Sequence, residues 1–169
     1  MSGGRTAIAA TNSSQCWTRS CREARLRLSS RTRLFLVDGH NLLFALRARF
    51  AEHLADGHPG TAAREALVEA TVGVFTGPIQ VVRIYFDGST PHREQRSTQV
   101  EVVYPGGKAD QCADRAILRE LAARDDDART GPVVTVVTRD IKLAKRARKR
   151  GAAVVDPEAF FEAWMQESG

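Results

Sequence analysis

The sequence has little of several residue types and patterns, and each shortage removes a class of protein. No apolar run in the 169 residues approaches the length of a membrane span, so a membrane protein is not indicated. The three cysteines are odd in number and form no CxxC pair, which argues against a disulfide framework and against a zinc site. A reducing, cytoplasmic compartment is therefore the default expectation.

Several common site patterns are also missing. No Ser, Cys or His triad is discernible, so a covalent route of catalysis is not expected. The stretch Asp38-Gly39-His40-Asn41 has one glycine, too few for a dinucleotide-binding turn, and PGGK lacks the spacing and the Ser or Thr of a phosphate-binding P-loop. A phosphatase of the haloacid dehalogenase type needs a second Asp two residues after the first, where this chain has His40.

The net charge of +5 comes from one end of the chain. Residues 1–32 hold six arginines and one acid, whereas residues 33–169 hold 19 basic and 19 acidic side chains and are neutral. The first 32 residues are rich in Ser, Thr and Arg, have few aromatics and show no sustained periodicity, so we expect a disordered basic extension. Its composition resembles a transit peptide, and a start codon assigned too far upstream would look the same. An organellar address is thus the alternative to a dispensable extension.

From residue 33 onward, strands alternate with helices in a single predicted domain, 33–169. Gly151 suits a helix C-cap, and Asp156 before Pro157 suits an N-cap, so Asp156 is assigned to structure. The alternation predicts an α/β fold with a mainly parallel, five-stranded sheet covered by helices on both faces. The pattern predicts strands at 34–38, 79–87, 100–104, 132–138 and 152–156, and helices at 41–53, 61–75, 110–124, 141–150 and 157–166.

Aspartates recur where such a fold would gather them. Asp38, Asp87 and Asp140 come at or just past the end of the apolar runs LFLVD, VVRIYFD and VVTVVTRD. Asp110 and Asp114 are spaced i, i+4, so both face the same way at the start of one helix. Side chains just past the ends of parallel strands converge on one edge of the sheet, where carboxylates repel one another unless a cation holds them. Oxygen ligands suit Mg²⁺ or Mn²⁺, whereas zinc prefers His and Cys.

Each aspartate also has a purely structural interpretation. Asp38 could be a turn residue, Asp140 could cap the helix that follows, and Asp87-Gly88 is an ordinary turn dipeptide. Asp110 and Asp114 could favour a helix N-terminus through its dipole. For any one aspartate alone the structural interpretation is the better one, but their joint placement favours a divalent metal site.

The motifs LFLVDGHNLLF, VVRIYFDG, GGKADQCADRAI and VVTVVTRD together resemble the NYN domain of the YacP type, a branch of the PIN-like nucleases. The resemblance covers residues 33–169 with the motifs in the expected order. It implies a PIN-like, three-layer α/β/α sandwich, a divalent-metal site and endoribonuclease activity on RNA. Carried over by position, Asp38, Asp87, Asp110 and Asp140 would form the acidic catalytic site, with Asp114 as a further metal ligand.

Two more residues follow from the same resemblance. Asn41 would form a hydrogen bond near the first carboxylate and orient it. At TRD the chain departs from the family, which commonly has a small residue before the aspartate, so Arg139 would either contact a phosphate or point outward with no role.

A cation held by these carboxylates would activate a water for in-line attack on phosphorus and neutralise a phosphate oxygen. The predicted function is therefore a Mg²⁺- or Mn²⁺-dependent endoribonuclease. The alternative is an RNA-binding or recruitment module whose acidic site is weak or silent. RNA is the expected partner, no membrane is expected, and ribosome association and oligomeric state are left open.

The segment 139–150 is the one dense cationic stretch of the neutral part of the chain. At about 100° per residue, Lys142, Lys145, Arg146 and Lys149 share one helix face, and with Arg139 they form a predicted RNA-binding surface that acts through phosphates. The alternative is an ordinary solvated face. Apolar side chains are expected to pack on the sheet from the other side of this helix: Ile141, Leu143, Ala144 and Ala147.

Overall fold

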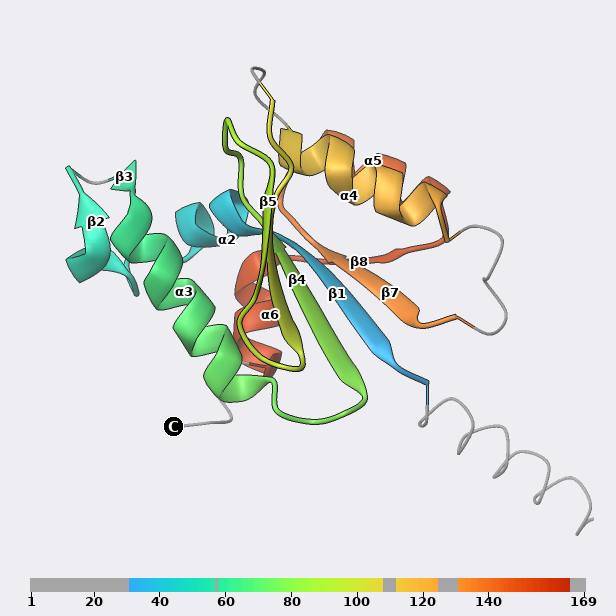
Figure 1. Ribbon diagram of the computed structural model, residues 1–169. Coiled ribbons are helices and arrows are strands. Elements are labelled where there is room, and N and C mark those ends of the chain that lie inside the picture. Colours follow the sequence, from blue (N-terminus) through green and yellow to red (C-terminus); the bar gives the residue numbers. More distant parts are fainter. Residues whose placement is uncertain (1–30, 57, 108–111, 125–130, 165–169) are drawn as a thin grey trace, which may run out of the picture. The chain divides into compact units, whose positions relative to one another are not determined.

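The β-branched runs of the sequence become the strands of one sheet in the computed structural model (Figure 1). The structure describes residues 31–56, 58–107, 112–124 and 131–164, and the elements below belong to the unit Thr32–Gly169. The sheet has six strands in the order β5-β6-β4-β1-β7-β8. Five are parallel to one another, and they are β1 (Arg33–Asp38), β4 (Gln80–Tyr85), β6 (Val100–Tyr104), β7 (Val133–Val137) and β8 (Ala153–Val155).

The prediction of five strands was wrong by one. The sixth strand, β5 (His92–Gln95), lies in a polar stretch and pairs antiparallel with β6 at the sheet edge, with His92 opposite Tyr104. Its sequence, HREQ, has no apolar side chain, because an exposed edge strand needs only backbone partners on one side. A pattern of alternating hydrophobicity therefore could not reveal it.

The helices are α2 (Gly39–Ala45), α3 (Thr61–Val74), α4 (Cys112–Ala122), α5 (Ile141–Lys149) and α6 (Pro157–Trp164). The predicted helix 41–53 is wrong in its second half, because α2 ends at Ala45 and a turn leads to the short 3-10 helix η1 (Ala51–His53). This turn brings the buried ring of Phe50 into the core. The predicted break before α3 contains a small antiparallel pair, β2 (Leu54–Ala55) and β3 (His58–Pro59).

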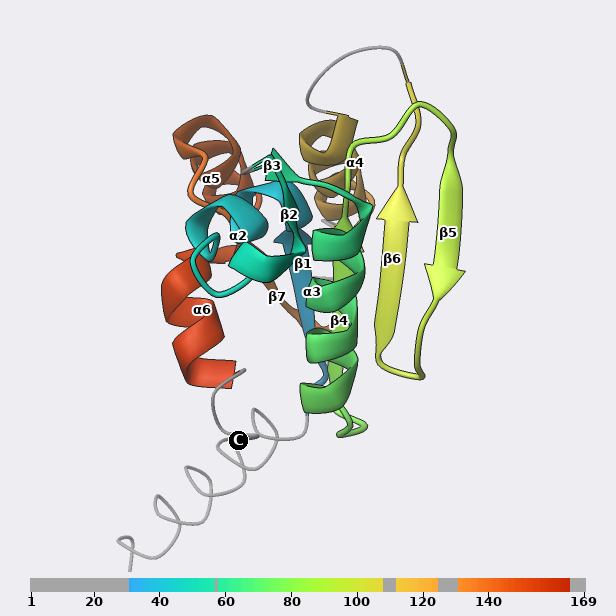
Figure 2. The same ribbon diagram turned by 90° about the vertical axis from the view of Figure 1, so that its left-hand side faces the viewer.

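Helices lie on both faces of the sheet (Figures 1 and 2). Along β1, Phe35 and Val37 join a core cluster with α2, α3 and α6, whereas Leu34 and Leu36 join a second cluster with α4 and α5. The alternation follows from the period of two in a strand. Each fully buried apolar side chain stabilises the fold by about 1.5–3 kcal/mol, so both faces contribute a core.

Two predicted helix ends are confirmed. Gly151 follows α5 with a φ of +76°, a conformation that glycine adopts without strain. Asp156 precedes α6, and its Oδ1 accepts a hydrogen bond of 2.9 Å from the backbone N–H of Glu158. Two other predictions fall partly outside the described residues. Residues 1–30 of the expected basic extension 1–32 are not described, and neither is the expected helix start at residue 110, which lies in the segment 108–111.

Between β1 and β7 the sheet changes the direction in which successive strands are added. The strands β4, β5 and β6 lie on one side of β1, and β7 and β8 lie on the other. The chain leaves β1 for α2 and α3 on one face and leaves β7 for α5 on the other face, although the two strands are neighbours. In open α/β sheets, ligands bind in the crevice outside the carboxyl ends of the strands at such a point. In the part of the chain that the structure describes, no helix is long and apolar enough to cross a membrane.

Candidate functional site

Asp38 lies at the carboxyl end of β1, beside this change of direction, and is almost fully buried. It is the N-cap of α2, because its Oδ1 accepts a hydrogen bond of 3.1 Å from the backbone N–H of Asn41. Its Oδ2 accepts a hydrogen bond of 3.3 Å from the hydroxyl of Thr138, just past β7. Both oxygens are thereby held from two neighbouring strand ends.

Asp140 has the same role one element later. Its Oδ1 accepts a hydrogen bond of 2.7 Å from the backbone N–H of Leu143, which makes it the N-cap of α5. The backbone N–H of Asp140 donates to the Thr138 hydroxyl over 3.1 Å, so this one buried hydroxyl contacts both Asp38 and Asp140. The capping interpretation of Asp140 is therefore confirmed, whereas Asp38, interpreted as a possible turn residue, is also an N-cap. Each still has a second carboxylate oxygen outside its cap.

Asp87 follows β4, and Asp114 lies in the first turn of α4. Oδ1 of Asp87 accepts a hydrogen bond of 2.9 Å from the backbone N–H of Ala113, next to Asp114 in the chain. Oδ2 of Asp87 lies 4.0 Å from Nδ1 of His40. Three segments that start helices thus turn their N-terminal ends toward these carboxylates.

The close approach of α2 to β4 depends on Gly39. A Cβ at this position would lie 2.4 Å from Cε1 of Phe86, a distance that real Cβ atoms do not reach. A side chain here would push α2, and with it His40, away from the end of β4. The glycine of the DGHN motif therefore serves close packing.

The electrostatics of the four aspartates are linked. Burial, together with the negative charges of Asp114 and Asp87, raises the pKa of Asp38 to about 6, against hydrogen bonds from Asn41 and Thr138 that lower it. Burial also raises the pKa of Asp114, with added repulsion from Asp140 and Asp87. Asp38 and Asp114 therefore lie in a region of excess negative potential, which favours a bound cation.

The chemistry of these donors suits a hard divalent cation, but the described residues do not form a complete ligand set by themselves. Within the ranges 31–56, 58–107, 112–124 and 131–164, no three His, Cys, Asp or Glu side chains lie close enough together to hold a metal ion. Asp110, the fifth predicted ligand, lies outside those ranges. The metal site therefore stays a prediction, supported by donor chemistry and mutual repulsion.

Arg139 contacts acidic side chains of the neighbouring segment. Its guanidinium forms ion pairs with Asp156 at 2.9 Å and with Glu158 at 3.1 Å. Its backbone N–H donates to Oδ1 of Asn41 over 2.7 Å. The Asn41 side chain thus holds the segment after β7, while its backbone N–H holds Asp38.

Thr138 was missed as a site residue, although the T-x-D spacing is typical of a hydroxyl that accepts from a backbone N–H two residues on.

The cationic side of α5 points to solvent. Lys142, Lys145, Arg146 and Lys149 are exposed, and in the described part of the chain no ion pair links the three lysines to an acid. Leu143, Ala144 and Ala147 are buried as expected, but the expectation for Ile141 was wrong, since it is 83% exposed. Ile141 is the first helical residue and, at about 100° per residue, lies outside the stripe of the other three.

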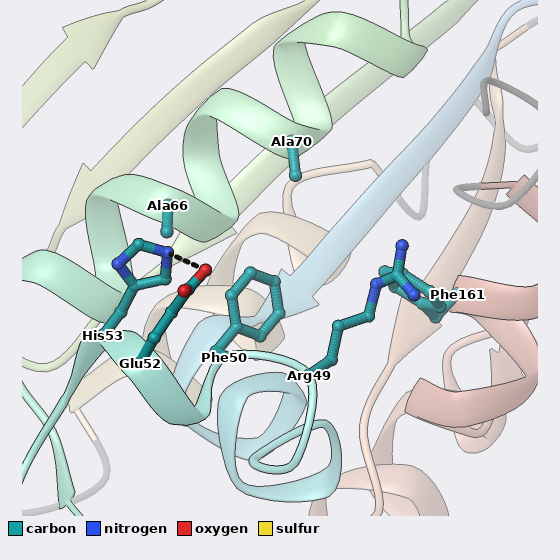
Figure 3. Close-up of a pocket in the computed structure, with 7 residues that line it drawn as sticks. All are labelled: Arg49, Phe50, Glu52, His53, Ala66, Ala70 and Phe161. Carbon is teal, nitrogen blue, oxygen red and sulfur yellow. Dashed lines mark ion pairs between the residues drawn. The ribbon is translucent and has the colours of Figure 1, made fainter.

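A separate pocket of about 390 Å³ lies between η1, α3 and α6, and none of the aspartates lines it (Figure 3). Figure 3 shows the Arg49 guanidinium over the ring of Phe161, at 4.7 Å from the ring centre. His53 forms an ion pair of 3.4 Å with Glu52 at the other end of the pocket. The candidate site is thus the aspartate-rich strand edge and not this pocket.

The protein has an open α/β fold with acidic residues at or just past the carboxyl ends of its parallel strands. The chain belongs to the YacP-like NYN domain family, whose model matches residues 35–168. It is similar in fold to the crystal structure of a mutant form of Rae1 (YacP) from Bacillus subtilis, with a TM-score of 0.58 and 19% sequence identity over 78% of this chain and 74% of that chain. No curated protein matched the chain. The predicted family is therefore confirmed.

Proposed function

We propose that this protein is a metal-dependent endoribonuclease that hydrolyses phosphodiester bonds of RNA at the aspartate-rich strand edge. The observation that carries the proposal is the mutual repulsion of Asp38, Asp87, Asp114 and Asp140 at the sheet's change of direction. Membership of a nuclease-like domain family supports it. Holding carboxylates near a buried one such as Asp38 destabilises a protein unless a cation balances their charge.

The proposed ligands of Mg²⁺ or Mn²⁺ are Asp38, Asp87, Asp110, Asp114 and Asp140, and the bound ion would supply charge neutralisation and activation of water. Asp38 is kept in place for this by the Thr138 hydroxyl and by the backbone N–H of Asn41. Burial and the nearby Arg64 charge lower the pKa of His40, so its ring is neutral at pH 7 and able to accept a proton beside Asp87. The exposed cations of α5 would hold the RNA backbone through its phosphates.

A cleavage assay tests this proposal. Purified protein is incubated with a labelled single-stranded RNA in Mg²⁺, in Mn²⁺ and in EDTA, and products are separated by gel electrophoresis. Internal cuts that require a divalent ion are expected. Absence of cutting in both metals, with the protein folded, would reject the nuclease.

The second candidate is an RNA-binding or recruitment module with a silent acidic site. The exposed lysines of α5 could bind RNA phosphates without any cleavage. It predicts RNA binding that is equal in Mg²⁺ and EDTA, with no cleavage in either. A cytoplasmic location stays a prediction under both candidates, and association with the ribosome stays open.

A further inference from the structure

Four rings form a continuous row from the acidic site to the edge of the sheet. His40, beside Asp87, meets the Phe86 ring edge-on with centroids 5.4 Å apart. Phe86 stacks with Tyr104 at 5.9 Å, and Tyr104 stacks with His92 at 6.3 Å. His40 lies in α2, Phe86 directly follows β4, Tyr104 ends β6 and His92 begins the antiparallel strand β5, so the row follows the carboxyl edge of the parallel strands.

The row passes from the core to solvent. Phe86 is fully buried, Tyr104 is partly buried and His92 is exposed. His92 and Tyr104 are direct partners across the β5–β6 pair, which holds their side chains on the same face. Figure 2 shows the start of β5 beside the end of β6.

Two glycines keep the outer rings in place. A Cβ on Gly88 would lie 3.2 Å from the Tyr104 ring, so this glycine leaves room for the ring. Gly106 has a φ of +73°, and a Cβ there would lie 2.7 Å from Pro91, next to His92 in the chain. The loop after β6 is thus packed tightly against the loop that enters β5.

The cation next to His92 in the chain is already paired with an acid, because Arg93 forms an ion pair of 3.0 Å with Glu101. Arg64 lies beside the inner, buried part of the row, 6.0 Å from the centre of the Phe86 ring. Attraction of phosphates at His92 is therefore weak compared with α5, whose lysines have no such partners in the described residues. The group available to a ligand here is the exposed ring of His92, which presents a flat face.

We propose that His92, backed by Tyr104, is a base-stacking subsite for an unpaired nucleotide of the RNA. The inference rests on the proposed function, because it places a neighbour of the cleaved bond along the same strand edge. An exposed ring at the end of a stacked row binds the face of any base, and only an unpaired base has a free face to offer. The substrate class that fits is single-stranded RNA.

Binding to abasic RNA tests the subsite. A short labelled single-stranded RNA and versions with one abasic nucleotide at successive positions carry the same number of phosphates, so any difference in affinity comes from a base. Affinities are measured by fluorescence anisotropy in EDTA, so the readout does not depend on cleavage. The wild-type protein should lose about tenfold in affinity at one or two adjacent positions, the usual effect of one stacked base.

Variants of His92 identify the ring that is responsible. His92→Ala, a change at an exposed position, should bind the intact RNA about tenfold more weakly and show no further loss with abasic RNA. His92→Phe keeps a ring without the imidazole and should bind as the wild type does. His58→Ala, an exposed histidine on β3, is the matched control and should keep the full abasic penalty.

Three outcomes would overturn the subsite. They are a wild-type protein with no abasic penalty, a His92→Ala variant that keeps the penalty, and a His92→Phe variant that loses it. Binding of a labelled aromatic peptide, with no binding of RNA, would assign the rings to a protein partner and reject the proposal as well. A wild-type protein that shows the penalty but cuts no RNA in Mg²⁺ or Mn²⁺ would reject the nuclease and keep the subsite.

Discussion

The side-chain oxygen of Asn41 accepts a hydrogen bond of 2.7 Å from the backbone N–H of Arg139, and this bond joins the segment after β1 to the segment after β7. The two segments are far apart in the sequence but lie side by side where the sheet changes direction. Since Asp38 directly precedes the first segment and the second carries Asp140, the bond fixes two aspartates relative to each other. Asn41 is therefore a positioning residue of the proposed site.

Replacing Asp38 with Asn should abolish cleavage and leave the fold intact. The change keeps the size and one hydrogen-bond acceptor but removes a charge that a hard cation needs. Cleavage rates and circular dichroism spectra of the purified variant check this. A variant that cuts RNA at the wild-type rate would show that no metal depends on Asp38.

Asp156→Asn is the matched control for this change. Asn caps a helix nearly as well as Asp, and the exposed ion pair with Arg139 that the change removes contributes little. Cleavage close to that of the wild type is expected. A large loss of activity would place Asp156 in the site.

Folding stability should depend on pH through Asp38. Its pKa of about 6 in the folded protein exceeds the ordinary value of 3.8, so the folded state binds the proton more tightly. The favourable contribution of the protonated form is fully present below pH 3.8 and is lost as the pH rises through about 6. In EDTA, the free energy of unfolding of Asp38→Asn should therefore match that of the wild type near pH 3.8 and exceed it by about 3 kcal/mol at pH 7.5. Urea unfolding at both pH values measures the difference.

A divalent ion should offset most of this difference in stability. An ion that binds the folded protein and not the unfolded chain raises the free energy of unfolding, by about 2.7 kcal/mol at a hundredfold excess over its Kd. Wild-type protein should show a rise in Tm with Mg²⁺ or Mn²⁺ in a thermal scan at pH 7.5, and Asp38→Asn should show little. Equal shifts in both proteins would place the ion elsewhere.

Thr138→Val should destabilise the protein and impair the site together. Its hydroxyl donates to Asp38 and accepts from the backbone N–H of Asp140, and leaving buried groups unpaired costs about 1–3 kcal/mol. Thr138→Ser should restore both stability and kcat. Thr71→Val is the matched control, because that buried hydroxyl bonds only within its own helix, to the carbonyl of Leu67. Urea unfolding and cleavage kinetics compare the three variants, and equal losses for Val at both positions would deny Thr138 a special role.

Replacing Lys142, Lys145 and Lys149 with Gln should weaken RNA binding and flatten its salt dependence. If each lysine neutralises one phosphate, the slope of log K against log salt should fall by about 2 for a single strand. The catalytic step at saturating RNA should change little. Arg93→Gln is the control, since that cation already pairs with Glu101. An unchanged slope in the triple variant would show that this face of α5 does not bind RNA.

Most strands and helices could be predicted from the local sequence. Buried parallel strands consist of continuous β-branched runs, so β1, β4, β6, β7 and β8 could be predicted. Gly151 and Asp156 marked helix ends by residue type alone. The edge strand β5 and the early end of α2 could not be predicted. The first depends on backbone pairing with β6, and the second on the need to bury Phe50.

The candidate site, too, could be predicted from the sequence only in part. Position in the chain put Asp38, Asp87 and Asp140 at strand ends, because the residue that follows a buried strand emerges at a fixed edge of a parallel sheet. Only the tertiary structure decided that Thr138 holds Asp38, that Arg139 pairs with Asp156, and that rings from four elements form one row. Such contacts join residues far apart in the chain, and their distances are set by how strands pair and helices pack, which local sequence patterns do not encode.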